Sequence, residues 1–216
     1  MTEDIYLAVG NTAYFFNNVF YDNMNVAGLG VVPTGCVRFN AVSVTGSQSA
    51  YIANNTIDSG CQINFDHVNS PLQPWNGSAN FQNNHFIGFS NLAGAYVCNT
   101  TGTCAISDKG NEVFQTEAAA NAQGYTQGNN YAPTASSGAT VGAGSSLSGS
   151  CSTYSSDSEL CNGTTDVDEV SGSGGEIANY PANPVVARQS GAWDAGAYQF
   201  ASTTVNPPTG LSAVVQ

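Results

Sequence analysis

One pattern, an Asn-Asn pair between apolar residues, recurs in Tyr14-Phe15-Phe16-Asn17-Asn18-Val19-Phe20, Tyr51-Ile52-Ala53-Asn54-Asn55-Thr56-Ile57 and Asn80-Phe81-Gln82-Asn83-Asn84-His85-Phe86. A fainter fourth copy is Gly110-Asn111-Glu112-Val113-Phe114, and the copies follow one another at intervals of 27 to 37 residues. A repeat of this size cannot bury its own apolar side and must stack on a neighbour. The pattern therefore predicts a stack of coils made of short strands, joined by loops of different length.

A second repeat pairs Gly35-Cys36-Val37-Arg38-Phe39 with Gly60-Cys61-Gln62-Ile63-Asn64-Phe65. Aligning the two cysteines gives an offset of 25 residues, whereas aligning the alternating apolar residues after them needs 26. Cysteines at equivalent positions of adjacent coils would lie about 4.8 Å apart, a spacing that a disulfide tolerates. A bulge would absorb the extra residue, so both alignments stay open.

Six cysteines form three sequence-local pairs, which are Cys36 with Cys61, Cys98 with Cys104, and Cys151 with Cys161. We interpret the pairs as disulfides formed in an oxidising compartment. The alternative is a set of buried free thiols. Metal binding is disfavoured, because the sequence contains no Cys-x-x-Cys and both histidines lie away from the pairs.

Charged side chains are few and mostly acidic. Three Lys and Arg residues against fifteen Asp and Glu residues give a net charge of −12. Such a surface repels nucleic acid, anionic lipid and uronate polymers unless a metal ion intervenes, so nucleic acid is not an expected partner. No stretch approaches the roughly 18 apolar residues of a membrane span, and membrane insertion is not expected either.

The chain changes character along its length. Residues 1–117 carry the predicted coils, 118–200 form a loop-rich continuation and cap, and 201–216 are a linker or the start of a truncated fibronectin type III-like domain. The chain enters a strand pattern without a secretory signal, yet its cysteines are typical of secreted proteins. We therefore expect part of a longer secreted or cell-surface protein with further domains.

An acidic segment follows the fifth cysteine. It contains Asp166, Asp168 and Glu169 and no basic residue up to Glu176. A solvated loop closed by the last disulfide explains this composition. The alternative is a calcium site, because clustered carboxylates suit a hard cation, although the spacing matches no EF-hand loop.

A family resemblance is carried by Arg188-Gln189-Ser190-Gly191-Ala192-Trp193-Asp194-Ala195-Gly196-Ala197-Tyr198-Gln199-Phe200, preceded by Tyr131-Ala132-Pro133-Thr134 and Val141-Gly142-Ala143-Gly144. Together with the Asn-Asn coils, these segments resemble bacterial secreted right-handed parallel β-helix repeat proteins of the pectate-lyase-like superfamily. The resemblance implies an all-β fold, a right-handed parallel β-helix solenoid with an irregular, disulfide-closed C-terminal cap.

The chemistry of this stretch fits a structural cap better than an active site. Trp193 and Tyr198 would plug the open end of the stack, where strand groups are otherwise unpaired. Asp194 would pair with Arg188 or accept backbone N–H groups.

The Asn-Asn pairs are also interpreted as structural. Asn17, Asn54 and Asn83, or the second Asn of each pair, would stack at one corner of the coils. Stacked amides hydrogen-bond to one another and to the turn backbone, so the repeat needs no ligand to explain it. His85, within the third copy, is assigned a structural role as well.

The favoured function is binding of, or adhesion to, a neutral polysaccharide. The resemblance implies a scaffold that often acts on polysaccharides, and aromatic rings beside amides suit the faces and hydroxyls of neutral sugars. Trp75, in a long loop, is the first candidate for a stacking platform, with a residue folded back onto the coil as the alternative. The further candidates are Tyr21, Tyr51, Tyr96 and Asn64.

Enzymatic and purely structural functions stay open. A polysaccharide lyase would need a base, for which Lys109 and Arg38 are the candidates, and calcium to neutralise a substrate carboxylate. A glycoside hydrolase would need two carboxyls about 5 to 9.5 Å apart. Asp58 and Asp66 are the candidates for that pair, on consecutive strands that would line up along one face. A surface spacer would need only the stack and a further domain.

Overall fold

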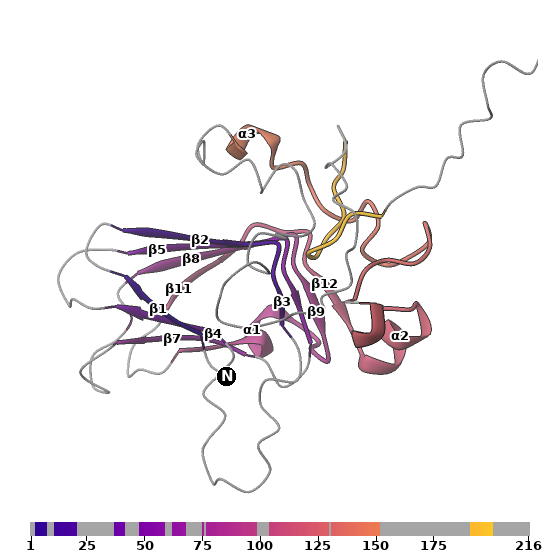
Figure 1. The fold of residues 1–216 in the computed structure, drawn as a ribbon. Helices are drawn as coiled ribbons and strands as arrows, with labels where there is room; N and C mark the ends of the chain where they lie inside the picture. Colours follow the sequence, from indigo (N-terminus) through magenta and orange to yellow (C-terminus); the bar gives the residue numbers. More distant parts are fainter. Residues whose placement is uncertain are drawn as a thin grey trace, which may run out of the picture.

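The computed structural model describes residues 3–7, 11–20, 37–41, 48–58, 62–67, 75, 77–98, 104–129, 131–151 and 191–200 (Figure 1). For 3–7, 40, 41, 66, 67 and 151 it describes the backbone alone. This part of the chain is rich in short parallel strands and contains few helices. None of the helices in it is long and apolar enough to cross a membrane.

The strands are β1 (Glu3–Leu7), β2 (Thr12–Phe16), β3 (Val19–Phe20), β4 (Val37–Ala41), β5 (Ser49–Ala53), β6 (Thr56–Ile57), β7 (Ile63–His67), β8 (Ser78–Gln82), β9 (His85–Ile87), β10 (Tyr96–Cys98), β11 (Ala105–Asp108) and β12 (Val113–Gln115). The helices are α1 (Leu92–Ala95), α2 (Glu117–Ala122) and α3 (Ser148–Cys151), with a 3-10 turn, η1 (Gln127–Asn129).

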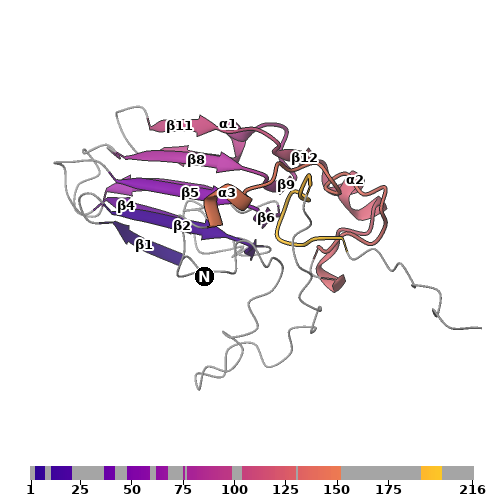
Figure 2. The same ribbon diagram turned by 90° about the horizontal axis from the view of Figure 1, so that it is seen from above.

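The chain passes through three parallel sheets in turn. Sheet A has the order β1-β4-β7-β10, sheet B β2-β5-β8-β11 and sheet C β3-β6-β9-β12. We call three successive strands a repeat, so β1–β3 form repeat 1 and β10–β12 form repeat 4. Figure 2 shows the strands of sheet B lying side by side as parallel arrows. The predicted parallel β fold is thereby confirmed.

The register settles how the second repeat of the sequence aligns. Val37 lies beside Ile63 and Phe39 beside Phe65, so the offset is 26 residues. The alternating apolar residues set this pairing, because a slip of one residue would turn them all to the other face of the sheet. The cysteines that precede these strands lie outside the described residues.

The fourth Asn-Asn copy is shifted by one residue from the predicted alignment. Val113 pairs with His85, so Asn111 rather than Gly110 is the equivalent of Asn83. Asp108 pairs with Phe81, and one more residue lies between Asp108 and Val113 than between Phe81 and His85. The alignment on Gly110 is therefore wrong.

The core lies between the three sheets and is built from inward-facing rows. Rings of successive repeats pack in register, as with Phe39 on Phe65 (centroids 5.5 Å apart) and Phe86 on Phe114 (5.4 Å). Burial of such rings removes large apolar areas from water, which is the main stabilising contribution. The fully buried members are Val37, Phe39, Ala50, Ile52, Ile57, Ile63, Phe65, Trp75, Ala79, Phe81, Phe86 and Ala95.

The first Asn of each pair turns the chain between sheets B and C. The φ angles of Asn17, Asn54, Asn83 and Asn111 are 60°, 54°, 58° and 64°. Asn enters this left-handed region more readily than other non-glycine residues, because its short polar side chain hydrogen-bonds locally. Backbone geometry therefore explains the first Asn.

The second Asn of each pair forms the predicted ladder. Nδ2 of Asn18 donates to Oδ1 of Asn55 (3.0 Å), and Nδ2 of Asn55 donates to Oδ1 of Asn84 (2.9 Å). The same oxygens accept the backbone N–H groups of Asn18 and Asn55, and the remaining amide N–H groups reach backbone carbonyls. Asn55 and Asn84 are buried, and this complete pairing removes the penalty of burying their amides.

Glu112 ends the ladder in the place of a fourth Asn. Its carboxyl accepts the backbone N–H of Asn84 (2.8 Å) and Nδ2 of Asn84 (3.3 Å). Burial raises the pKa of Glu112 to about 8, and the hydrogen bonds from Asn84 oppose the shift. This end of the ladder is therefore neutral in mildly acidic solution and charged in alkaline solution.

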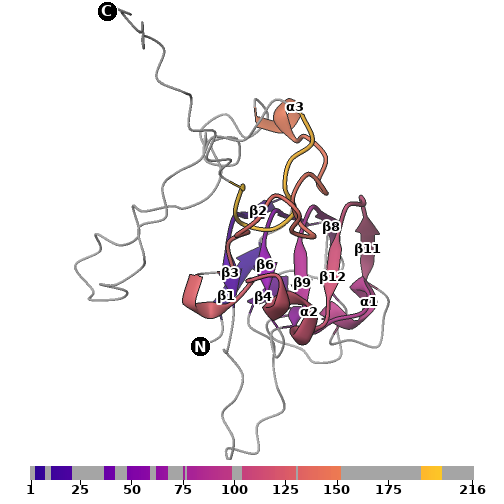
Figure 3. The same ribbon diagram turned by 90° about the vertical axis from the view of Figure 1, so that its right-hand side faces the viewer.

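Segments that follow the strands in sequence cover the outer face of sheet C. Helix α2, the chain after it and residues 191–200 lie on this side of the molecule (Figures 1 and 3). Ile87, Ala120, Tyr125 and Tyr131 form a second buried cluster there, with Val19 packed against it. The outer face of sheet C is therefore an interior surface.

Residues 193–200 contact sheet C through their backbone. The N–H of Ala197 donates to Oγ1 of Thr56 (3.0 Å), and the N–H of Gly196 donates to the carbonyl of Asn83 (2.7 Å). Gly196 has a φ of 87°, and a Cβ at this position would lie 2.7 Å from Oγ1 of Thr56. A residue without a side chain is what permits this approach.

The prediction that Trp193 and Tyr198 plug the open end of the stack is wrong about where they lie. Trp193 and Tyr198 are buried, but the segment that carries them lies against the side of the stack. Asp194 accepts the backbone N–H groups of Gly142 (2.7 Å) and Phe200, one of its two predicted roles. Its other predicted partner, Arg188, lies outside the described residues.

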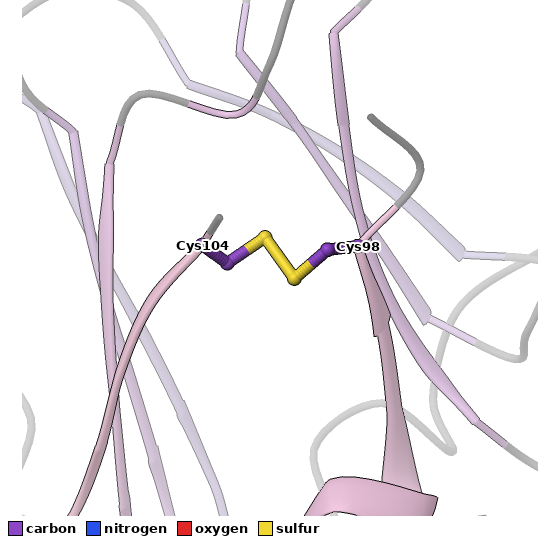
Figure 4. Close-up of a disulfide and its surroundings, with 2 residues drawn as sticks. All are labelled: Cys98 and Cys104. Carbon is purple, nitrogen blue, oxygen red and sulfur yellow. A yellow bond between two sulfur atoms is a disulfide. The ribbon is translucent and has the colours of Figure 1, made fainter. Parts of the chain in front are cut away.

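A disulfide joins Cys98, at the end of β10, to Cys104, just before β11 (Figure 4). It closes the connection between sheets A and B in repeat 4, as the sequence predicts. Of the other two proposed pairs, Cys36, Cys61 and Cys161 lie outside the described residues, and only the backbone of Cys151 is described.

Candidate functional site

The outer face of sheet B presents rows of side chains, because alternate residues of a strand point to opposite faces, and two of these rows line a groove. Register partners on neighbouring strands form each row. The first row is Tyr14, Tyr51 and Asn80, and the second is Phe16, Ala53 and Gln82. Repeats 1 and 2 therefore contribute rings and a methyl group, while repeat 3 contributes amides.

Tyr14 and Tyr51 form the most distinctive element of this face. Their ring centroids are 5.6 Å apart and the ring planes differ by 24°, so the rings are stacked. The two side chains are 43% and 40% exposed, unlike the buried rings of the core. Stacking follows from the register, because side chains on directly paired strands stand close enough to interact. The pair is an accessible aromatic platform.

A groove with a cavity of about 150 Å³ runs along this face. The residues that line it from the sheet B side include Tyr14, Tyr51, Asn80, Gln82 and Lys109. Leu147 and Ser150 line it from the segment 145–151, which contains α3 and lies beside sheet B in Figure 1. The groove therefore has walls from two distant parts of the chain.

Asn83 holds the second wall in place. Its Nδ2 donates to the carbonyl of Ser145 (2.8 Å), and its Oδ1 accepts the N–H of Ser145 (2.9 Å). Nε2 of Gln82 adds a bond to Oγ of Ser145 (2.8 Å). A Cβ on Gly144 would lie 3.0 Å from Cγ of Asn83, so a side chain at this position would crowd the clamp. The segment is fixed at its base before it reaches Leu147.

Lys109 is the one charged side chain among the described residues that line the groove. Its backbone N–H donates to the carbonyl of Phe81 (2.8 Å), which fixes its place at the end of sheet B. The carboxylate of the adjacent Asp108 accepts the N–H of Gly110 (2.7 Å) in the following turn. As far as its described lining residues go, the groove is thus uncharged over repeats 1 to 3 and cationic at repeat 4, on a chain whose net charge is −12.

The proposed hydrolase pair does not share a face. Asp58 follows β6 of sheet C, and Asp66 lies in β7 of sheet A. The carboxylate of Asp58 accepts a hydrogen bond from the hydroxyl of Tyr131, within the chain that covers sheet C. The expectation that these two residues line up along one face is wrong, because successive strands belong to different sheets.

The two proposed bases are separated as well. Arg38 lies in β4 of sheet A, whereas Lys109 follows β11 of sheet B. Only Lys109 lines the groove. A lyase site built from both residues therefore finds no support in this arrangement.

Trp75 is not a stacking platform. The side chain is 2% exposed, and its ring packs 5.2 Å from that of Phe65, centroid to centroid. A Cβ on Gly77 would lie 2.7 Å from the indole, so the chain folds closely over it. The alternative, a residue folded back onto the core, is the correct one.

Two further binding candidates are also internal. Asn64 is 1% exposed, and the ring of Tyr96 packs against Phe65 (6.3 Å) and Phe81 (6.1 Å). Tyr96 pairs with Ile63 and so lies in an inward-facing row. Both assignments are wrong, because sheet position and not residue type decides exposure.

The remaining candidates divide between the groove and the undescribed chain. Tyr51, one of the predicted sugar-binding residues, lines the groove. Tyr21 and the calcium candidates Asp166, Asp168 and Glu169 lie outside the described residues. Within the described ranges, no three His, Cys, Asp or Glu side chains are grouped as a metal site.

Sequence reasoning missed Tyr14, Asn80, Gln82 and Leu147. A signal for the first three was present, because Tyr14, Tyr51 and Asn80 occupy the same position of the aligned Asn-Asn copies, and Gln82 lies two residues on. Leu147 had none, since it lies in an Ala-, Gly- and Ser-rich segment far along the chain.

His85 belongs to the covered face and not to the groove. Its ring is fully buried, packs 4.8 Å from that of Tyr125, and hydrogen-bonds through Nε2 to Oε1 of Gln115 (2.7 Å). Desolvation by burial lowers the pKa of His85 to about 4, although the bond to Gln115 opposes this. A neutral imidazole without access to solvent has a packing role.

Comparison with protein-family models, with curated proteins and with solved structures found no match to this chain. The function has to be inferred from the groove.

Proposed function

We propose that this chain is a right-handed parallel β-helix of the pectate-lyase-like type that binds polysaccharide through the groove on sheet B, as a module of a secreted or cell-surface protein. The stacked, exposed pair of Tyr14 and Tyr51 beside the amides of Asn80 and Gln82 carries the proposal. A sugar ring presents apolar C–H groups on its faces and hydroxyls around its edge. Aromatic rings match the first and amides the second.

The ligand is a neutral polysaccharide, or one with few charges. The acidic excess of the chain repels a polyanion at a distance, and a single Lys109 offsets little of that field. A densely charged uronate polymer would need bridging cations. The described part of the groove offers no carboxylate to hold them.

Binding without turnover fits the groove better than hydrolysis. A glycosidase needs a pair of carboxyl groups on either side of the scissile bond. No Asp or Glu is found among the described lining residues. Among the described lining residues, only Lys109 and the hydroxyls of Tyr14 and Tyr51 could supply acid or base chemistry.

The experiment compares the wild type with Tyr51→Ala and Tyr14→Ala on immobilised neutral polysaccharides. We expect each substitution to weaken retention about tenfold, because a stacking contact with a sugar face is lost, equivalent to about 1.4 kcal/mol. Gln127→Ala is the matched control, since Gln127 is exposed in η1 and does not line the groove.

Three results would count against the proposal. If the Tyr variants and the control are retained equally, the groove is not the binding site. If the wild type is retained on none of the neutral glycans, the proposed function is wrong. Release of reducing ends or of an unsaturated product would replace a binding module by an enzyme, and Lys109→Ala would then be the first variant to assay.

A further inference from the structure

We propose that the enclosed part of the groove holds one six-membered sugar ring, with Leu147 as the residue that limits its size. A mono- or disaccharide would then supply most of the affinity. This inference rests on the proposed function and specifies its smallest ligand.

The size of the cavity is the first reason. A volume of about 150 Å³ accommodates one six-membered ring of the size of benzene. A pyranose is somewhat bulkier than benzene, so a second ring has no room under Leu147 and Ser150. Further sugars of a chain would lie outside the enclosed part.

The distribution of polarity is the second reason. Tyr14, Phe16, Tyr51 and Ala53 make the repeat 1 and 2 end of the cavity apolar, whereas Asn80, Gln82 and Lys109 make the other end polar. The side-chain amide of Asn80 makes no hydrogen bond in the described structure, so its N–H groups and oxygen are available to a ligand. One sugar ring placed here sets its C–H face on the rings and its hydroxyls on the amides.

The fixed position of the second wall is the third reason. Ser145 is clamped by Asn83 and Gln82, and the N–H of Ser150 bonds to the carbonyl of Leu147 (2.7 Å), closing the turn of α3. Leu147 is therefore held over the groove by a preorganised segment, and little side-chain freedom is lost when a ligand binds.

The test measures affinity against ligand length by calorimetry. The probes are β-1,4-linked glucose, mannose and xylose with one, two, four and six units. We expect the affinity for the preferred sugar to reach a plateau at the disaccharide, so that the hexasaccharide binds within about twofold of it. An affinity that rises tenfold or more from two to six units would overturn the single-ring site while leaving polysaccharide binding intact. Binding of no probe of any length would overturn both.

Leu147 variants sharpen the test. Leu147→Ala should weaken the disaccharide about fivefold by opening the wall, and Leu147→Met should restore near wild-type affinity because it keeps the volume. Ser148→Ala is the matched control, since Ser148 is exposed in the same segment and does not line the groove. Unchanged disaccharide affinity in a folded Leu147→Ala protein would exclude Leu147 from the site.

Discussion

The outer faces of sheets B and C are built from the same repeats and have opposite fates. On sheet B, Tyr14 and Tyr51 stand exposed in a groove. On sheet C, the chain that covers the strands carries Tyr125 and Tyr131, and both are buried. Aromatic residues outside the core therefore do not mark a binding surface by themselves, and the presence or absence of a cover decides their role.

Side-chain size on the two faces explains the difference. On sheet C, Thr56 and His85 point outward. Thr56 accepts a backbone N–H of the covering chain, and His85 packs against a ring of that chain. Gly196 lets the covering chain come close. On sheet B, two stacked tyrosines and a phenylalanine point outward. These large rings lie between the strands and the 145–151 segment, and a cavity remains there. The side chains on each outer face therefore explain why sheet C is closely covered and sheet B carries an open groove.

The largest expected effect is the difference between Tyr125, in the chain that covers sheet C, and Tyr51, on the open face of sheet B. Tyr125→Ala should lower the free energy of unfolding by about 3 to 5 kcal/mol, because a ring that is 1% exposed leaves a cavity and the bond from its hydroxyl to Thr140 (2.7 Å) is lost. Tyr51→Ala should lower it by less than half as much, since the ring is already 40% exposed. Urea unfolding of both variants measures the difference.

Glycan retention completes that comparison. The Tyr125→Ala protein, where it remains folded, should retain glycan like the wild type, and Tyr51→Ala should not. Equal destabilisation by the two substitutions would mean that the open and covered faces are not distinct.

An intermediate effect is expected for a pair of glycines with positive φ. Gly196→Ala should destabilise the protein by about 2 kcal/mol or more. Alanine is strained in the left-handed backbone conformation at this position, and its Cβ would clash with Thr56. Gly142→Ala should cost about 1 kcal/mol, since Gly142 has a φ of 66° but nothing lies within 4 Å of its Cβ position. Thermal melts should show the larger fall for Gly196; the reverse order would argue against close packing on sheet C.

The remaining effect depends on pH and concerns Glu112, at the corner that both faces share. The unfolded chain ionises Glu112 near pH 4.5, and the folded protein holds the proton until about pH 8. Between these values the folded state binds more protons than the unfolded one, so stability falls as the pH rises through this window. Glu112→Gln should flatten that fall.

Urea unfolding of the wild type and Glu112→Gln across this pH range provides the measurement. Glu117→Gln, in the first turn of α2, is the control for removing an acidic charge outside the ladder. A decline of the same slope in Glu112→Gln and the wild type would show that the ladder end does not hold a proton.

The repeats made the strand stack, the Asn ladder and the pairing of inward-facing residues predictable. These features are local or depend on adjacent copies, so equivalent positions of aligned copies become neighbours in space. The search for aromatic sugar-binding residues named Tyr51 but overlooked Tyr14, although both occupy one position of the aligned copies.

Burial by distant segments was not predictable. Trp75 and Asn64 looked available in the sequence and are buried, while Asp58 and Asp66 looked adjacent and belong to different sheets. Residues 193–200 looked like an end cap and lie along the side of sheet C, with Ala197 bonded to a threonine 141 residues away.

The sequence by itself determined that strands of successive copies stack in register, because each short copy buries its alternating apolar row only against the equivalent row of its neighbour. Only the tertiary structure decided which outward row is covered and which lines a groove. That choice depends on where Gly144, Leu147 and Gly196 meet strands far away in the chain, and no local pattern encodes those contacts.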